Sequence, residues 1–102
     1  MITRLWHGWT TLENANQYEA LLKSEVLPGI HRIQGYRGAT LLRRNSSSEA
    51  EFITLTYFES IEDVKAFAGD DYEMAVVPPD ARKLLFHFDQ RSAHYETVFK
   101  LE

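Results

Sequence analysis

The sequence predicts an α+β domain with a ferredoxin-like chain path, in which strands and helices follow one another in the order β-α-β-β-α-β. Four stretches rich in β-branched and aromatic residues have the character of strands. Two stretches with apolar residues at helical spacing separate the first strand from the second and the third from the fourth. The 102 residues, 44% of them apolar and 25% charged, fit a single folded domain over residues 1–102.

The first strand and the first helix are expected near the amino terminus. Ile2 to Thr10 has the β-branched and aromatic residues of a strand. Thr11 is a suitable N-cap for the helix that follows, whose apolar residues are Ala15, Tyr18, Leu21, Leu22 and Val26. We expect Pro28-Gly29 to end this helix, and the connector over residues 30–34 has room for one helical turn.

The central part of the chain predicts two strands and a second helix. The strands are expected over Tyr36 to Arg44 and Phe52 to Glu59, joined by the polar loop Asn45 to Glu51. Ser60 is placed to cap the second helix, whose buried stripe is Ile61, Val64, Phe67 and Ala68.

An irregular helical insertion is expected before the last strand. Gly69 interrupts the second helix, and Tyr72 to Val77 has room for another turn or two. A double proline then breaks the chain, and Asp80 can cap a short helix through Leu85. Phe86 to Phe99 supplies the last strand.

This plan leaves one face of a four-stranded antiparallel sheet without helices. The third strand carries Phe52 and Phe58 at one parity, and at the other parity it carries Ile53, Leu55 and Tyr57. A large apolar sheet face normally has a cover. Because 13% of the residues are aromatic and so short a chain has a thin core, we expect a second copy of the chain to cover this face.

Composition excludes several classes of function. The net charge of −4 leaves no broad basic face for nucleic acid or for an anionic membrane. The absence of cysteine excludes disulfides, thiolate nucleophiles and iron–sulfur clusters. No apolar run approaches the roughly 20 residues of a membrane span, and the first residues lack the shape of a signal peptide, so we expect a cytoplasmic protein. The four histidines lack an HExxH spacing, and we expect no metal site.

Short segments along nearly the whole chain carry a family resemblance. They are Ile2-Thr3-Arg4-Leu5-Trp6-His7-Gly8, Pro28-Gly29 through Gly35-Tyr36-Arg37-Gly38, Leu41-Leu42-Arg43-Arg44, Phe58-Glu59-Ser60, Ala66-Phe67-Ala68-Gly69-Asp70-Asp71, Ala75-Val76-Val77-Pro78-Pro79 and His94-Tyr95-Glu96. In this order the chain resembles the antibiotic biosynthesis monooxygenase (ABM) domain family of the dimeric α/β-barrel superfamily. The resemblance implies a homodimer whose two sheets form a barrel, with a cavity between sheet and helices in each protomer. It also implies one of two activities: cofactor-independent oxidation of phenols or quinols, or haem degradation.

Four positions depart from the family pattern. Members often have a tryptophan where this chain has Phe58, and the polyphenol monooxygenases have an asparagine where it has Thr54. The haem-degrading members have a catalytic tryptophan and a histidine where this chain has Phe67 and Val77.

Three residues are candidates for catalysis. His94 is the candidate base or haem ligand, because histidine titrates near neutral pH, and Glu96 shares its strand face and could orient it. Tyr72 could donate a hydrogen bond to a phenolic or quinone oxygen. His7 and Trp6 face opposite sides of the first strand, so one of them faces the cavity.

The expected cavity walls complete the prediction. They are Trp6, Thr54, Phe58 and Phe67, with Glu96 beside His94, and Arg4 would meet an anionic substrate if its side chain faces inward. The leading interpretation is a homodimeric monooxygenase without cofactor, acting on a small aromatic, phenolic or quinol substrate. The alternatives are a non-catalytic dimer that binds a hydrophobic ligand or a partner, and a haem-binding or haem-degrading protein.

Overall fold

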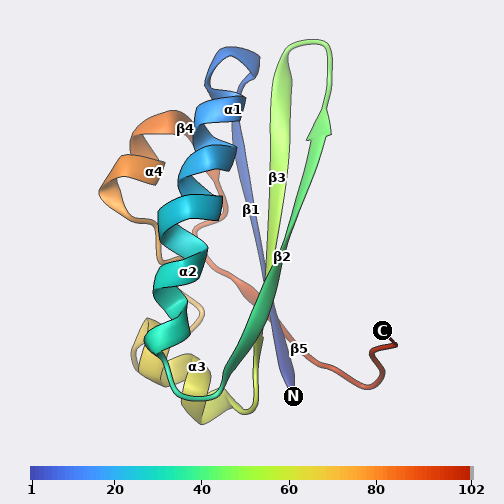
Figure 1. Ribbon diagram of the computed structural model, residues 1–102, viewed down its shortest axis with the longest axis vertical. Helices are drawn as coiled ribbons and strands as arrows, with labels where there is room; N and C mark the ends of the chain where they lie inside the picture. The colour runs from blue at the N-terminus through green and yellow to red at the C-terminus, as the bar shows by residue number, and fades with distance from the viewer. Residues whose placement is uncertain (102) are drawn as a thin grey trace.

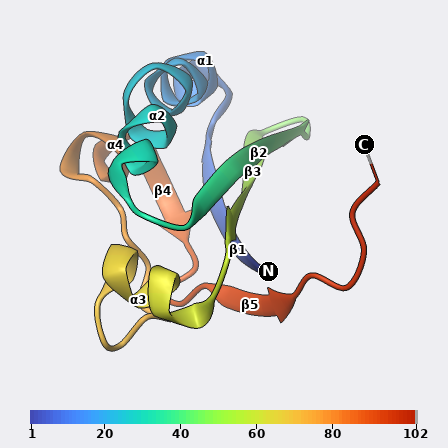
Figure 2. The same cartoon turned by 60° about the horizontal axis from the view of Figure 1, so that its bottom comes forward.

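The structure is a computed structural model that describes residues 1–101. Its strands are β1 (Ile2–Thr11), β2 (Tyr36–Asn45), β3 (Glu49–Phe58), β4 (Leu85–Phe88) and β5 (Ala93–Glu96). Its helices are α1 (Leu12–Leu21), α2 (Leu27–Gly29), α3 (Ile61–Ala68) and α4 (Pro79–Leu84), with a π-helical segment at Leu22–Val26 and a 3₁₀ turn at Ile30–Arg32. One antiparallel sheet has all of these helices on one face (Figures 1 and 2), which confirms the α+β ferredoxin-like prediction.

The sheet has the order β2-β3-β1-β4, and β5 also pairs with β1. Both short strands occupy the same edge of β1, because β4 pairs with residues 8–10 and β5 with residues 2–5. The prediction of one continuous last strand is therefore wrong. Between β4 and β5 the chain leaves β1 and hydrogen-bonds to residues 73–75. The Ala75 N–H donates to the Gln90 carbonyl over 3.0 Å, and the Ser92 N–H donates to the Glu73 carbonyl over 2.6 Å.

The first helical stretch ends at Gly29 and is followed by the 3₁₀ turn at Ile30–Arg32, which confirms both the predicted helix end at Pro28-Gly29 and the helical turn in the connector. Proline lacks a backbone N–H and its ring normally clashes one turn earlier. The π-helical segment just before it provides a wider turn, in which the Leu27 N–H donates to the Leu22 carbonyl, five residues back. Helical conformation then persists to the 3₁₀ turn at Ile30–Arg32.

Other local predictions are confirmed or shifted by a few residues. The hydroxyl groups of Thr11 and Ser60 accept hydrogen bonds from the third following N–H group, as N-caps do. The hairpin loop is shorter than expected, since β2 and β3 pair as far as Asn45 and Ala50. Asp80 lies in the first turn of α4 and does not cap it. Residues 70–78 form no helix.

Two core clusters lie between the helices and the sheet. One gathers Tyr18 and Leu22 against Phe52, and the other gathers Ile30, Tyr36, Phe58 and Val64. Alternation along β3 explains the division, because Phe52 and Phe58 face the helices and are fully buried. Among residues 1–101, no helix has the length and hydropathy needed to span a membrane.

The opposite face of the sheet has no helix on it (Figure 2). Its apolar side chains, from every second position of the strands, are Leu5, Trp9, Leu42, Ile53, Leu55, Tyr57 and Tyr95. Leu42 is 45% exposed and Tyr95 56% exposed. The carboxy-terminal segment runs out on this side of the molecule, where Lys100 Nζ lies 4.0 Å from the centre of the Tyr57 ring. The two-sided apolar pattern predicted for the sheet is thus present.

Candidate functional site

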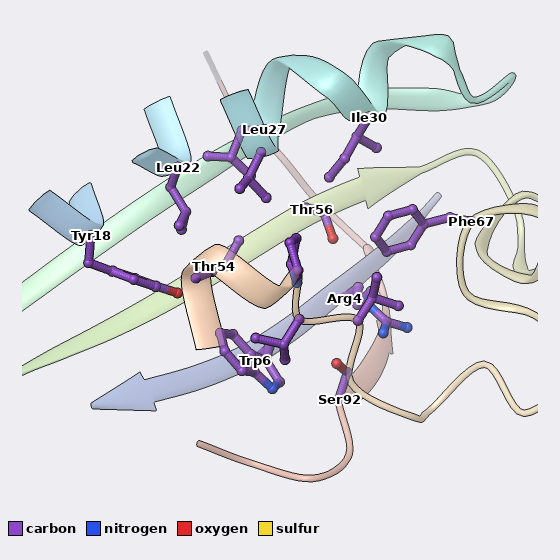
Figure 3. A pocket seen from close by; sticks show the side chains of 15 residues that line it. Arg4, Trp6, Tyr18, Leu22, Leu27, Ile30, Thr54, Thr56, Phe67 and Ser92 are labelled. Atoms are coloured by element: carbon purple, nitrogen blue, oxygen red, sulfur yellow. The ribbon is translucent and has the colours of Figure 1, made fainter. Parts of the chain in front are cut away.

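A cavity lies between the two core clusters, with the sheet below it and the helices above it (Figure 3). Its volume is about 60 Å³. Its lining residues come from β1, α1, the helical stretch through Ile30, β3, α3 and the segment 76–81. A wider groove of about 370 Å³ adjoins it. The two spaces share five lining residues, namely Val26, Ile30, Phe67, Val76 and Pro78.

The floor of this inner cavity consists of alternate residues from the two central strands. Arg4 pairs with Thr56, and Trp6 pairs with Thr54, and all four side chains line the cavity. Successive side chains of a strand point to opposite faces, so Arg4 and Trp6, two residues apart, both point toward the helices. This arrangement resolves which face of β1 lines the cavity.

The roof of the cavity comes from the helical stretch around the π-helical segment. Leu22, Val26, Leu27 and Ile30 all line the cavity. The wide turn before Pro28 keeps these side chains on one continuous face, even though a proline follows. Tyr18 completes this side, and burial raises the pKa of its phenol, so its hydroxyl group stays protonated and neutral.

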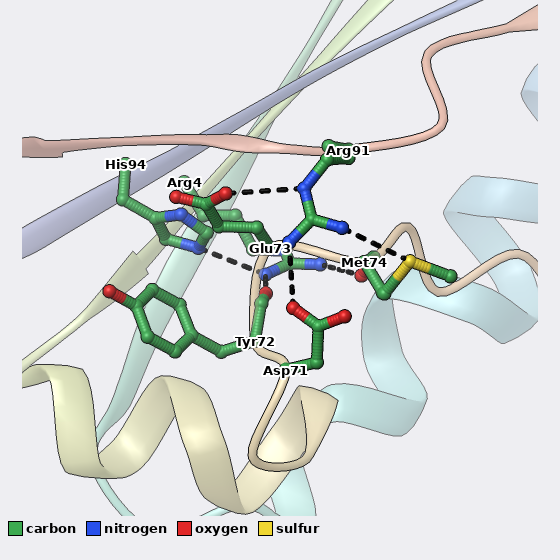
Figure 4. A network of polar contacts seen from close by, with 7 residues as sticks. All are labelled: Arg4, Asp71, Tyr72, Glu73, Met74, Arg91 and His94. Carbon is green, nitrogen blue, oxygen red and sulfur yellow. Dashed lines mark hydrogen bonds and ion pairs between the residues drawn. The ribbon is translucent and has the colours of Figure 1, made fainter.

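Arg4 is the only charged residue among those that line the inner cavity, and its side chain is held by neutral acceptors (Figure 4). Its guanidinium donates to the Tyr72 carbonyl, to His94 Nε2 over 2.9 Å and to the Met74 carbonyl over 3.0 Å. Its Cζ also lies 5.5 Å from the centre of the Phe67 ring. These contacts fix the cation at the end of the cavity that Phe67 shares with the outer groove.

The Arg4 cation has no carboxylate partner within ion-pair distance in residues 1–101. The residue is 4% exposed, and burial lowers its pKa to about 10. Arginine is rarely so buried without an acidic partner. At neutral pH the side chain therefore holds a positive charge beside an apolar cavity.

His94 and Tyr72 lie behind Arg4 and do not line either cavity. The two rings meet edge to face, with centres 5.0 Å apart. Since a guanidinium only donates hydrogen bonds, His94 Nε2 is the acceptor and the neutral ring carries its proton on Nδ1. That buried Nδ1 atom has no hydrogen-bond partner in the described chain. Burial, and then the Arg4 charge, lower the pKa of His94, while Glu73 raises it.

Of the two alternatives left open for β1, Trp6 faces the cavity and His7 lies on the opposite sheet face, away from the site of the catalytic role considered for it. Its Nε2 is 3.5 Å from the Glu51 carboxylate and its Nδ1 is 3.3 Å from the Asp89 carboxylate. Its ring stacks on Trp9 at 5.6 Å between centres. Strand alternation places Trp6 inward and His7 outward.

Three of the predicted wall residues line the cavity and two do not. Trp6, Thr54 and Phe67 face it. Trp6 is anchored there by its Nε1, which donates to the Asp89 carbonyl over 2.7 Å. Phe58 is fully buried in the core beside Val64. Glu96 is exposed, and Arg4 contacts His94 in its place.

Sequence reasoning missed some of the cavity, including Tyr18, Leu22, Ile30 and Ser92. A signal for Tyr18 and Leu22 was present, because they belong to the apolar face of the first predicted helix, whereas Ile30 fell in the connector after that helix. Ser92 had no such signal, since its position depends on the break between β4 and β5. Nor does any histidine in residues 1–101 line the inner cavity or the adjoining groove. Within the same residues no cluster of histidine and carboxylate side chains has the arrangement of a metal site.

The fold is that of ABM-domain proteins, as the sequence resemblance implied. A proposed antibiotic biosynthesis monooxygenase from Bacillus cereus superposes with a TM-score of 0.69 at 16% identity, over 99% of this chain and 96% of that chain. The haem-degrading protein MhuD from Mycobacterium tuberculosis, solved with two haems in its active site, superposes with a TM-score of 0.64 at 16% identity. That match covers 100% of both chains.

A mutant of MhuD, solved with two manganese protoporphyrin IX molecules per active site, gives the same TM-score of 0.64 at 16% identity, over 100% of this chain and 99% of that one. Scans of the sequence against protein-family models and curated proteins found no match. At such low identity the likeness shows the fold alone, and function has to be argued from the site.

Proposed function

We propose that the protein binds a small, mostly apolar ring compound between its sheet and its helices and oxidises it as a cofactor-independent monooxygenase. The observation that carries this proposal is the apolar cavity between sheet and helices with few polar groups, chiefly Arg4 and the hydroxyl groups of Thr54, Thr56 and Ser92. Ligand sites typically combine apolar walls with a few convergent polar groups. The solved structures with this fold include a haem degrader with haem in its active site.

The volumes indicate how such a ligand would lie. A cavity of about 150 Å³ holds a benzene ring, so the inner cavity of about 60 Å³ suits a polar substituent better than a ring. The adjoining groove of about 370 Å³ has room for one ring or two fused rings. A ring in the groove with its oxygen directed past Phe67 would bring that oxygen to Arg4.

The proposed reaction needs no electron source besides the substrate. A phenolate transfers an electron to O₂, and the resulting phenoxyl radical and superoxide combine to form a C–O bond. The peroxide then loses water, which leaves a quinone: one oxygen atom of O₂ enters the ring and the other leaves as water. The protein has to bind the phenolate, keep bulk water out and stabilise negative charge.

Oxygen uptake by the metal-free protein, measured with 1-naphthol, tests the proposal. We expect uptake above the rate without protein, and we expect it to disappear in Val77→Phe, because the added ring fills the inner cavity that Val77 lines. Val98→Phe is the matched control, since Val98 is 88% exposed. Equal uptake by both variants would contradict the proposal.

Two alternatives give different results in the same samples. Ligand binding without oxygen uptake would favour the non-catalytic, ligand-binding dimer. Haem binding with a shifted Soret band would favour the haem interpretation, which the cavity supports less because no histidine in residues 1–101 lines it. The cytoplasmic location and the homodimer remain part of the proposal, and the open apolar face of the sheet supports the homodimer.

A further inference from the structure

We propose that Arg4 recognises an ionised oxygen conjugated with the ring of the ligand, so that the substrates are acidic ring compounds bound as anions. This inference rests on the proposed function, because it names the substrate class of the same cavity. Arg4 is a specificity-determining residue in this proposal.

The first argument is the unpaired charge. Three N–H groups of Arg4 donate to neutral acceptors, on Tyr72, His94 and Met74. A guanidinium has five N–H donors, so two are left without a partner by these contacts. The side chain is buried and lacks a carboxylate partner in residues 1–101. An anion that enters the cavity would supply the missing charge, and hydrogen bonds between two charged groups are the strongest kind.

The second argument is an unpartnered hydroxyl group in the same cavity. The Thr54 Oγ1 atom is buried and has no hydrogen-bond partner in residues 1–101, although most buried polar atoms have one. Thr54 pairs with Trp6, two residues along the strands from the Arg4–Thr56 pair and on the same sheet face. It also lines the cavity. Figure 3 shows Thr54 and Trp6 on the same side of the space as Arg4. The hydroxyl group can donate to an oxygen of the ligand.

The geometry also assigns a role to His94. A neutral ring that accepts from Arg4 at Nε2 orients the guanidinium without neutralising it. His94 is therefore a positioning residue that acts through Arg4 and does not touch the ligand. Burial of Arg4 lowers its pKa only to about 10, so the charge is present throughout the neutral range.

Titration of 4-nitrophenol bound to the wild-type protein tests the inference directly, because its ionised form absorbs visible light. An opposite charge within a few ångströms lowers the pKa of an acid by roughly one to three pH units. We expect the bound compound to ionise at correspondingly lower pH than the free compound. Ionisation at or above the free value would overturn the inference.

Nitrobenzene is the neutral control for the same ring. Its binding is measured by quenching of Trp6 fluorescence in a Trp9→Phe background, which leaves a single tryptophan because the chain has two. In Arg4→Met we expect the affinity for 4-nitrophenolate to fall about tenfold or more and the affinity for nitrobenzene to stay within about twofold. Arg37→Met, which removes an exposed arginine paired with Glu59, should change neither.

A second variant covers the case in which Arg4→Met fails to fold. Thr54→Val keeps the shape of the side chain and removes a hydroxyl group that has no partner, so folding is retained. We expect weaker binding of 4-nitrophenolate and unchanged binding of nitrobenzene. An equal effect on both compounds would contradict the inference while leaving the cavity proposal intact, whereas a wild-type protein that binds neither compound would overturn both.

Discussion

At the scale of single residues, burial and then the charge of Arg4 lower the pKa of its neighbour His94. The two side chains share a hydrogen bond of 2.9 Å, and a proton on His94 Nε2 would remove its acceptor and place two cations together. Tyr72 contributes only its ring to this histidine, and the Glu73 carboxylate partly offsets the repulsion. His94 is thus neutral in the folded protein at pH values where a free histidine has begun to ionise.

We expect His94 to make the protein less stable as the pH falls. Its pKa in the folded chain is below the usual 6.5, so in mild acid the unfolded chain binds a proton that the folded chain does not. The free energy of unfolding therefore decreases as the pH falls below about 6.5. Urea unfolding of the wild-type protein and of His94→Gln at about pH 7.5 and about pH 5.5 measures this effect.

In His94→Gln the decrease should be smaller than in the wild type, because the linked proton is gone. His87→Gln, on the exposed part of β4, is the control and should keep the wild-type decrease. The same pH dependence in the wild type and in His94→Gln would show that His94 does not titrate as described.

At the scale of elements, the contact between the start of β2 and the start of α3 holds the cavity wall in place. Gly35 precedes β2 with a φ of +86°, and its carbonyl accepts from the Glu59 N–H over 2.9 Å. The Asp63 carboxylate lies against Gly35 and is held by the Ser60 hydroxyl group over 2.9 Å. Because α3 carries Phe67, which lines both the inner cavity and the groove, this junction determines the position of Phe67 between them.

Gly35→Ala should destabilise the protein by more than about 1 kcal/mol. An L side chain is strained at positive φ, and its Cβ would fall on the Asp63 carboxyl group, which the cap of α3 holds in place. Gly29→Ala is the matched control, since Gly29 has a helical φ of −62° and open space around its Cα. We expect that control to be neutral or to stabilise by up to about 1 kcal/mol.

Thermal or urea unfolding of both alanine variants gives the comparison. Equal stability of Gly35→Ala and Gly29→Ala would show that the contact between Gly35 and Asp63 can rearrange without loss of folding free energy.

At the scale of the whole molecule, the two faces of the sheet have different covers. The helices cover the face that carries Phe52 and Phe58, and the open face carries apolar residues of the same strands, such as Ile53, Leu55 and Tyr57. Burying apolar surface contributes about 25 cal/mol per Å². A second copy of the chain placed against this face would therefore gain substantial free energy, and a closed pair of sheets would exclude water from it.

We expect the protein to sediment as a dimer at micromolar concentration and Leu55→Lys to sediment as a folded monomer. Leu55 lies on the open face in the middle of β3, so a lysine there would place a charge in the interface. Leu12→Lys is the control, since Leu12 is an exposed residue at the start of α1 in the helical layer. A monomeric wild-type protein, or a dimeric Leu55→Lys variant, would refute the proposed interface.

The sequence by itself determined the order of the elements, the two-sided pattern of the sheet and the ends of several helices. These features follow from short-range spacing: alternation assigns Phe52 and Ile53 to opposite faces, and the side chains of Thr11 and Ser60 cap helices through N–H groups three residues away. The same alternation placed Arg4 and Trp6 together, although it left open which face they share.

Only the tertiary structure decided the chemistry of the cavity. Whether Arg4 or His7 faces the helices, and whether His94 meets Arg4 or Glu96, depends on strands far apart in the sequence. The break between β4 and β5 likewise depends on backbone bonds to residues 73–75. Burial is a property of the assembled layers, and burial turns an ordinary arginine into an unpaired charge beside an apolar cavity.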